Sequence, residues 1–307
     1  MHVFRGLPET ADVPVALTIG NFDGVHRGHQ AMLSRLLEAA EDLALPPAVL
    51  TFDPHPREFF GRASAPPRLS TLRGKLEAFA AQGIERTYIA RFNAAMAGLS
   101  PATFIERVLV RRLRAQWVLV GEDFRFGKGR AGDLAALRAE ARTFSVEAMR
   151  TVAIAGERAS STAVRAALRD GDMTRATALL GRPYRISGRV AHGAKLGRSL
   201  GFPTANIALR NRPPLTGIFA VRVHGLRGGQ HLGAASLGVR PTVTETGPTL
   251  LEVFLFDFDE AIYGQRLHVD FMHKLRDEAR YDNLEALRRQ IGDDVAQARA
   301  FFATLES

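Results

Sequence analysis

The sequence predicts an α/β protein of two domains: a doubly wound parallel sheet in the first half, and an antiparallel β-barrel followed by a C-terminal helix in the second. Short apolar runs alternate with amphipathic helical patterns up to about residue 180, which is typical of repeated βα units. Beyond that point, runs rich in Val, Ile and Phe are separated by Gly, Pro and Asp. A length of 307 residues suits two domains of ordinary size, and we place them at residues 1–182 and 183–307.

The elements of the first half follow from their hydrophobic patterns. The expected strands are residues 15–19, 48–52, 87–90, 117–120 and 145–152, and the expected helices are residues 27–43, 72–81, 101–113 and 133–142. The third helix has a clear start, because Ser100 can cap it and Pro101 suits a first helical position. The run at 117–120 is wholly apolar, which indicates a strand buried on both faces of a parallel sheet.

The second half reads as strands followed by one helix. The expected strands are residues 185–190, 217–224, 231–237, 250–256 and 266–271. The expected helix is residues 283–304, with one apolar face made by Leu284, Leu287, Ile291, Val295 and Ala298. Short β-type runs of this number and spacing favour a closed or nearly closed antiparallel barrel.

Composition excludes several classes of protein. The chain has no cysteine, so it has neither disulfides nor a thiol nucleophile, and we expect a cytoplasmic location. It contains no apolar run long enough to cross a membrane and no apolar core of signal-peptide length at its N-terminus. The net charge of +9 is spread over both halves, which suits anionic small substrates and does not support nucleic-acid binding. We expect a monomer or a weak homo-oligomer.

The stretch TIGNFDGVHRGHQ (residues 18–30), which follows the first expected strand, has the features of an anion site. His26 and His29 are three residues apart, which places both imidazoles on one face of the first helical turn. The free N–H groups of that turn suit a phosphate, and glycines such as Gly20 and Gly28 let the backbone approach a bulky anion. The alternative is a glycine-rich loop with two surface histidines. The position after a buried strand favours the anion site.

Three further motifs of the first half also follow expected strands. They are FDPHP (residues 52–56), GEDFRFG (residues 121–127) and SSTAVR (residues 160–165), the last of which opens a helix. In a doubly wound sheet these loops converge with the histidine stretch on one edge, so we predict a single active site there. Taken singly, each has a plainer interpretation: a rigid loop, a turn with packed phenylalanines, and an ordinary helix cap with a surface arginine.

The second half carries its own candidate phosphate site in HGAKLGRSLGFPTANI (residues 192–207). Its glycines can wrap phosphates and its cations can offset their charge; these residues are Gly193, Lys195, Gly197 and Arg198. Thr204 and Asn206 offer neutral oxygens at the i, i+2 spacing of a strand, which suits Mg²⁺ held mostly by water and nucleotide phosphates. The spacing is not that of a Walker A loop. The alternative is a β-turn followed by an unremarkable threonine–asparagine pair.

Glu252 stands in the very apolar run LLEVFLFDF, where a carboxylate does not serve packing. If the side chain points into a cleft, it can accept a proton from an alcohol that attacks phosphorus. If it points outward, it is an ordinary solvated strand residue.

Together these motifs resemble the prokaryotic bifunctional riboflavin kinase/FAD synthetase family. The matching pieces are TIGNFDGVHRGHQ, LTFDPHP, VGEDFRFG, SSTAVRAAL, GRPYRISGRVAHGAKLGRSLGFPTANI, LGVRPTV, LEVFLFDF with IYGQRLHVDF, and LRDEARYDNLEAL. They occur in the family's order and cover nearly the whole chain. The resemblance implies a nucleotidyltransferase-like N-terminal domain that adenylylates FMN with ATP, giving FAD and pyrophosphate. It implies a C-terminal domain that phosphorylates riboflavin with ATP to FMN, and Mg²⁺ in both reactions.

The resemblance also assigns residues in the N-terminal domain. His26 and His29 would bind ATP phosphates and stabilise charge on the α-phosphate and the departing pyrophosphate, while Arg165 would hold the β- and γ-phosphates. The other ATP-binding residues would be Gly20, Asn21, Phe22, Asp23, Gly28, Asp123, Ser161 and Thr162. Asp53 would face the flavin.

In the C-terminal domain the resemblance assigns Thr204 and Asn206 to Mg²⁺ and Glu252 to the role of base. The loop with Gly193, Lys195, Gly197 and Arg198 would cover ATP. Arg276 would lie in a flavin-facing segment.

Two other functions compete with this interpretation. One is a single-activity FMN adenylyltransferase whose barrel binds flavin without catalysis; it would make FAD from FMN but no FMN from riboflavin. The other is a nucleic-acid-binding protein with a synthetase-like histidine motif and a basic barrel. The barrel strands show no interleaving of aromatic and basic residues, which weighs against the second.

Overall fold

The computed structural model describes residues 1–61, 64–192, 200–239 and 249–306. The chain forms two compact units. The first contains Met1–Pro66 and Ser70–Ser160, and the second contains Pro67–Leu69 and Ser161–Ser307. No helix in the described ranges has both the length and the apolar composition needed to cross a membrane.

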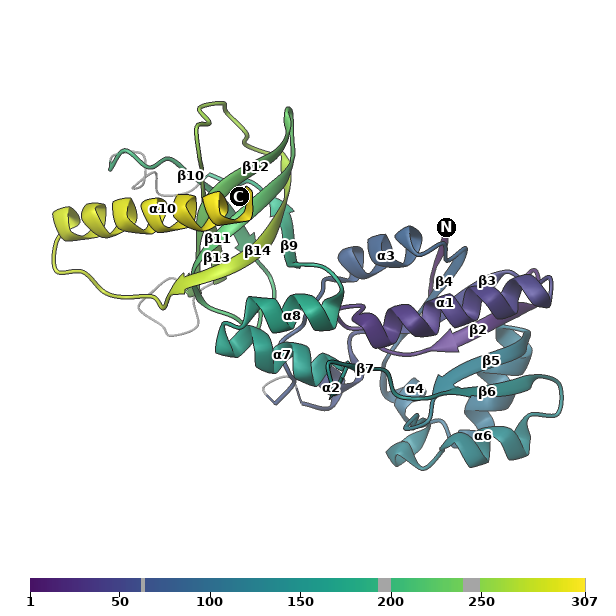
Figure 1. Cartoon of the computed structure of the whole chain (residues 1–307). Helices are drawn as coiled ribbons and strands as arrows, with labels where there is room; N and C mark the ends of the chain where they lie inside the picture. Colours follow the sequence, from purple (N-terminus) through teal and green to yellow (C-terminus); the bar gives the residue numbers. More distant parts are fainter. Residues whose placement is uncertain (62–63, 193–199, 240–248, 307) are drawn as a thin grey trace. The chain divides into compact units, whose positions relative to one another are not determined.

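The first unit is built on a six-stranded parallel sheet with strand order β1-β4-β3-β2-β5-β6 (Figure 1). Its strands are β1 (His2–Arg5), β2 (Val15–Ile19), β3 (Pro47–Asp53), β4 (Arg86–Arg91), β5 (Ala115–Gly121) and β6 (Ser145–Met149). Its helices are α1 (Arg27–Asp42), α2 (Pro56–Phe60), α3 (Leu72–Ala81), α4 (Ala94–Ala97), α5 (Pro101–Phe104), η1 (Ile105–Arg112), η2 (Lys128–Arg130) and α6 (Leu134–Glu140). A separate two-stranded hairpin, β7 (Ala153–Ile154) and β8 (Glu157–Arg158), follows β6.

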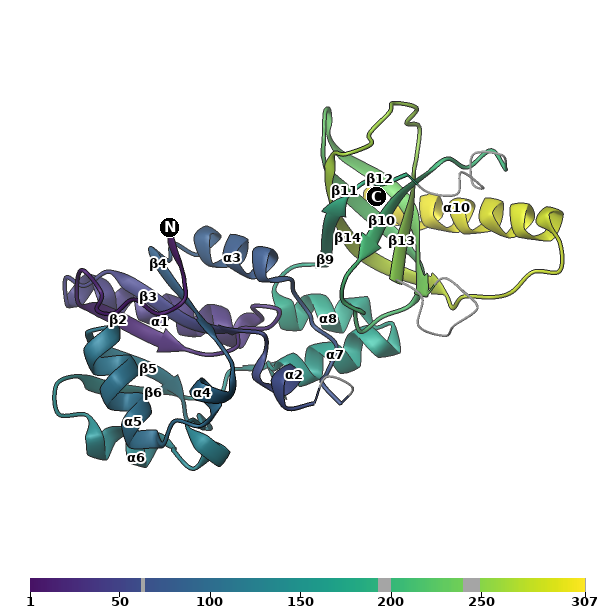
Figure 2. The same ribbon diagram turned by 180° about the vertical axis from the view of Figure 1, so that it is seen from behind.

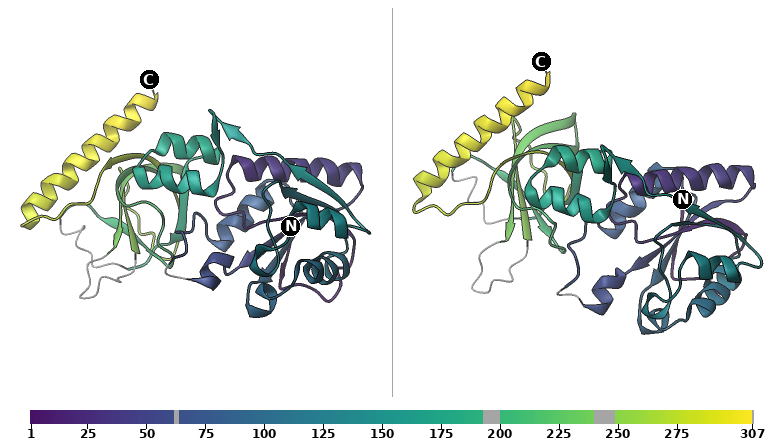
Figure 3. Two further views of the ribbon diagram at one scale, coloured as in Figure 1. Left: turned by 90° about the horizontal axis from the view of Figure 1, so that it is seen from below. Right: turned by 60° about the horizontal axis from the view of Figure 1, so that its bottom comes forward.

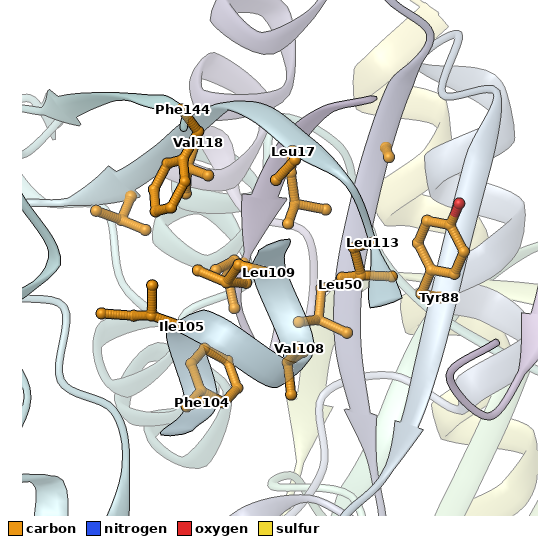
Figure 4. Packing of buried hydrophobic residues seen from close by; sticks show 14 of the residues in the cluster. Leu17, Leu50, Tyr88, Phe104, Ile105, Val108, Leu109, Leu113, Val118 and Phe144 are labelled. Carbon is orange, nitrogen blue, oxygen red and sulfur yellow. The ribbon is translucent and has the colours of Figure 1, made fainter. Parts of the chain in front are cut away.

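Alternating residues of the buried strands pack against helices on opposite faces of this sheet. On one face, Leu33 and Leu36 of α1 and Phe79 of α3 pack on the strands. On the other, α5 and η1 contribute a hydrophobic cluster that includes Phe104 and Leu109, seen in Figure 4 beside Leu17, Leu50 and Tyr88 of the strands. The prediction of a doubly wound parallel sheet is therefore confirmed.

The second unit is a curled, six-stranded antiparallel half-barrel with strand order β10-β13-β12-β11-β14-β9 (Figure 2). Its strands are β9 (Tyr184–Arg189), β10 (Thr204–Leu209), β11 (Gly217–Leu226), β12 (Gly229–Val239), β13 (Thr249–Leu255) and β14 (Arg266–Arg276). The edges of the curled sheet meet at one bridge, where the Ala191 N–H donates to the Asn206 carbonyl at 2.8 Å. The predicted, nearly closed barrel is confirmed.

Among the described residues of the second unit, the helices are α7 (Ser161–Asp170), α8 (Met173–Leu180) and α10 (Leu284–Glu306). The helix α10 lies against the outer face of the barrel (Figure 3), where Ala298 and Phe302 pack on Ala220 and Ala234. The helix α8 contacts β9 and β14, which is why the segment 161–182 groups with the barrel. The main division of the chain between the compact units thus falls after residue 160, whereas the sequence predicts the functional boundary at 182.

Several elements differ from the sequence expectation in detail. The strand β1 is an added edge of the first sheet, β10 is a sixth barrel strand, and β14 continues five residues beyond the expected end at residue 271. The helix expected at 101–113 changes at Ile105 to π-type hydrogen bonding, in which the Leu113 N–H donates to the Val108 carbonyl at 3.0 Å.

Candidate active sites

The first candidate site lies where the strand order of the parallel sheet reverses. The chain runs from β2 through β3 to β4 in one direction and then crosses to β5 on the other side of β2. The loops after β2 and β5 therefore flank the switch point at the carboxyl edge, where open α/β sheets bind ligands. The loop after β2 is residues 20–26, and the loop after β5 contains Asp123.

The loop 20–26 is held in an unusual backbone conformation. Phe22 and Val25 have positive φ angles of 50° and 43°, which are strained for residues with a β-carbon. Both side chains are buried, so packing beneath the sheet edge holds the strain. At Gly28 a β-carbon would lie 3.0 Å from the Ala159 carbonyl oxygen, so the close approach of two backbones explains this glycine.

The two histidines form one unit at the start of α1. His26 is the N-cap residue, and its Nδ1 accepts the His29 backbone N–H at 3.4 Å, so the ring proton of neutral His26 belongs on Nε2. The rings stack with centroids 3.6 Å apart, which is too close for two imidazolium ions. The Phe22 ring is tilted against the His29 ring, with centroids 5.0 Å apart.

His29 is neutral at pH 7. Desolvation, the nearby His26 ring and the Lys75 ammonium all hold the pKa of His29 well below its usual value of 6.5. Because the unfolded chain binds the proton first, acidification below about pH 6.5 disfavours folding of this unit. A neutral imidazole offers hydrogen bonds to an anion rather than a charge.

The aspartates assigned by resemblance occupy different places along the same edge. Asp23 is buried, and its Oδ1 accepts the Ser70 N–H at 3.1 Å, which fastens the loop to the segment before α3. Asp53 ends β3 at the carboxyl edge. Asp123 is exposed and pairs with Arg158. Asp23 is therefore placed to hold the loop, whereas Asp53 and Asp123 stand at the edge itself.

Residues Ser161, Thr162 and Arg165 lie in the first turns of α7, which belongs to the second unit. This segment follows the separate β7–β8 hairpin and not a strand of the main sheet, contrary to the expectation that all four loops follow sheet strands. Arg165 is buried, and its Nε donates to the Pro67 carbonyl at 2.7 Å. The structure therefore places these residues and the two histidines in different compact units.

The second candidate site is a cavity of about 780 Å³ between the outer face of the barrel and α10. Thr204, Asn206, Glu252 and Arg276 all line it. The opposite wall carries the predicted apolar face of α10: Leu284, Leu287, Ile291 and Val295. Loop residues Gly193, Lys195, Gly197 and Arg198 lie outside the described part of the chain.

Glu252 and Asn206 are brought together by strand register. They face each other as a pair between β13 and β10. Along β13 the residues alternate, with Leu251 and Val253 fully buried in the barrel and Glu252 facing the cavity. Of the two orientations open from sequence, the structure therefore has the carboxylate on the cleft side.

The residues at this corner suit a hard cation such as Mg²⁺. Asn206 is 7% exposed, and its Oδ1 has no hydrogen-bond partner among the described residues. Its amide Nδ2 donates to the Thr204 carbonyl at 3.1 Å, which identifies Oδ1 as the unpartnered atom of the amide. A buried, unpartnered carbonyl oxygen beside a carboxylate and a hydroxyl is the donor type that Mg²⁺ takes in proteins.

Arg276 forms an ion pair with Asp294, a residue that the sequence motifs did not indicate. Its Nε and Nη2 donate to the two carboxylate oxygens of Asp294 at 2.7 and 2.6 Å, and its Nη1 donates to the Asp277 carbonyl at 2.8 Å. Asp294 is 4% exposed and lies on α10. The sequence did contain a signal for this residue: an aspartate stands beside the apolar face predicted for that helix.

We expect Asp294→Asn to destabilise the second unit by about 2 kcal/mol, because it breaks a largely buried bidentate pair whose arginine is partly exposed. The single tryptophan, Trp117, lies in the first unit, so its fluorescence reports that unit while far-UV circular dichroism reports both. In urea unfolding of Asp294→Asn, the midpoint seen by circular dichroism should move to a lower urea concentration. The midpoint seen by Trp117 fluorescence should not change. Asp293→Asn, at the exposed neighbouring position, is the matched control. Equal stability of the two variants would contradict the expectation.

Comparison with known proteins finds flavin-synthesising relatives over nearly the whole chain. Two family models match: FAD synthetase over residues 9–163 and riboflavin kinase over residues 180–302. A bifunctional riboflavin kinase/FMN adenylyltransferase from Pseudomonas fluorescens is 50% identical over 289 residues, covering 93% of this chain and 92% of its own length. The protein of that name from Escherichia coli K12 is 43% identical, with 98% of both chains covered. A solved structure described as a macrolide-efflux protein from Streptococcus pneumoniae has a TM-score of 0.80 at 27% identity, covering 95% of this chain and 97% of its own. The chain belongs to the bifunctional riboflavin kinase/FMN adenylyltransferase family.

Proposed function

We propose that the chain makes FAD from riboflavin in two ATP-dependent steps, with phosphorylation to FMN in the barrel domain and adenylylation to FAD in the parallel-sheet domain. The single observation that carries this is the presence of both family matches, one over residues 9–163 and the other over residues 180–302. We keep residues 1–182 and 183–307 as the functional domains. Since both steps consume ATP, we propose the cytoplasm as their location and a monomer or weak homo-oligomer as the working form.

In the kinase step, Glu252 accepts the proton of the riboflavin 5′-hydroxyl as that oxygen attacks the γ-phosphorus of ATP. The bond from this phosphorus to the β–γ bridging oxygen breaks, and ADP leaves. Thr204 and Asn206 would hold Mg²⁺, which would neutralise phosphate charge there. The apolar wall from α10 excludes water from the attacking oxygen, and the Arg276–Asp294 pair fixes the flavin-facing segment beside it.

In the adenylylation step, a phosphate oxygen of FMN attacks the α-phosphorus of ATP, and pyrophosphate leaves. The work of the protein is to position the two anions and to stabilise the charge that builds on the transferred group. His26 and His29 donate hydrogen bonds to the phosphates from the N-terminal turn of α1, where the helix dipole favours an anion. Ser161, Thr162 and Arg165 hold the β- and γ-phosphates, and Asp53 and Asp123 stand on the flavin side.

The single-activity alternative is not favoured. A barrel that only bound flavin would have no use for a carboxylate paired in register with a cation-binding amide. The nucleic-acid alternative also loses its basis, because the matches of both units are to flavin enzymes.

One incubation tests the proposal. With riboflavin, ATP and Mg²⁺, separation of the flavins over time should show FMN first and FAD later. FAD from added FMN, with no FMN from riboflavin, would support the single-activity alternative. Riboflavin alone at the end, with a correctly folded protein, would refute both. FMN that accumulates before FAD appears would show that the product leaves the first site before it enters the second.

A further inference from the structure

Lys75 is a buried cation at the carboxyl edge of the parallel sheet that none of the assigned roles uses. It lies in α3, and only 7% of its surface is exposed. Lysine is among the residues least often buried, because its ammonium loses hydration in the interior. A lysine in this position therefore calls for a reason connected with its charge.

The ammonium is joined to the histidine loop through one hydroxyl. Lys75 Nζ donates to Thr51 Oγ1 at 3.3 Å, and this oxygen in turn donates to the Asn21 carbonyl at 3.4 Å. Thr51 lies on β3 and is fully buried, so the chain of contacts links α3, the sheet and the loop 20–26. The loop carries backbone strain at Phe22, and a contact of this kind helps to hold it.

The same ammonium acts on the imidazole beside the loop. Its charge is one of the three causes that keep His29 neutral, together with desolvation and the His26 ring. Close by, Asn21 Oδ1 and His29 Nδ1 are buried and have no hydrogen-bond partner among the described residues. The region thus combines a standing positive charge with two unsatisfied polar atoms: His29 Nδ1 can donate to a bound anion when it carries the ring proton, and an ordered water can donate to Asn21 Oδ1.

We propose that Lys75 is a positioning residue for adenylyl transfer: it anchors the loop 20–26 through Thr51 and supplies the fixed positive charge of the histidine site. This inference rests on the proposed function of that site. The stacked imidazoles are poor carriers of charge because they lie too close together for both to be protonated. A buried ammonium held in place before the substrate arrives needs no reorganisation when charge develops on the phosphates.

The first test compares three variants in the full chain with Mg²⁺-ATP. We expect Lys75→Met to lower kcat/KM for FAD formation from FMN by about tenfold or more, with most of the loss in the KM for ATP, and Lys75→Arg to restore most of it. Arg73→Met removes an exposed cation two residues away and should leave the rate within about twofold. Riboflavin phosphorylation in the same samples should be unchanged, since it belongs to the other unit.

The second test does not depend on turnover. Titration of ring-labelled histidines by NMR should show a higher His29 midpoint in Lys75→Met than in the natural chain or in Lys75→Arg. Thr51→Val keeps the Lys75 charge but removes the hydroxyl that links Lys75 to the Asn21 carbonyl. It should therefore leave the His29 midpoint unchanged and raise the KM for ATP. Trp117 fluorescence reports whether the unit stays folded in each variant.

An unchanged His29 midpoint in Lys75→Met, or a KM for ATP equal to that of the natural chain, would overturn the proposal. So would a loss in Lys75→Arg as large as in Lys75→Met, because a role that depends on charge predicts rescue. A natural chain that makes no FAD from FMN would instead refute the proposed function. The titration would still decide whether Lys75 sets the charge state of His29.

Discussion

Replacement of Glu252 by glutamine is expected to lower the rate of FMN formation from riboflavin by about 100-fold or more, which is the usual worth of a general base. Glutamine keeps the shape of the side chain facing the cavity, so the KM for riboflavin should change little. The measurement is separation of flavins after incubation with ATP and Mg²⁺. FAD formation from added FMN should proceed at the natural rate, because the histidine site lies in the other unit.

Glu260→Gln is the matched control, since that glutamate is exposed in the same domain. It should behave as the natural protein does. A Glu252→Gln variant that still phosphorylates riboflavin at the natural rate would exclude Glu252 as the base. Loss of both activities would instead mean that the two sites do not work separately.

Replacement of His29 by alanine is expected to have the reverse effect. FAD formation from FMN should fall by about 100- to 1,000-fold, the cost of removing one donor that stabilises charge in a transition state. FMN formation from riboflavin should continue, so the reaction should stop at FMN. His2→Ala, an exposed histidine of the same unit, is the control for loss of an imidazole as such. FAD formation by His29→Ala at the rate of that control would show that the imidazole has no part in the reaction.

Most of the parallel sheet could be predicted from sequence because its signals are local. Short apolar runs such as residues 117–120 are typical of strands buried on both faces, and Ser100 with Pro101 marks a helix start within two residues. The strand β1 was missed because a four-residue edge strand buries little and shows no pattern. The strand β10 (Thr204–Leu209) was missed because its polar residues Thr204 and Asn206 leave too short an apolar run to predict a strand.

In the candidate sites too, residues with a local signal could be located from sequence, whereas residues that act through long-range contacts could not. The helix-start position of His26 and His29 is a property of neighbouring residues, so the pattern alone located it. The contacts made by Lys75 and Asp294 were out of reach, because each joins segments that are distant in the chain. Lys75 sits among helix residues that look solvent-facing, and only the packing of α3 on the sheet buries it.

The sequence by itself determined the two folds, the order of their elements and which residues share a face of a helix or strand, because periods of 3.6 and 2 follow from backbone geometry. Alternation along β13 places Glu252 on the face opposite Leu251 and Val253. Whether that face meets water or encloses a cavity was decided only by α10, which begins 32 residues after Glu252 and packs on the outer face of the barrel. Such long-range packing depends on the fit of whole surfaces, and no local pattern records it.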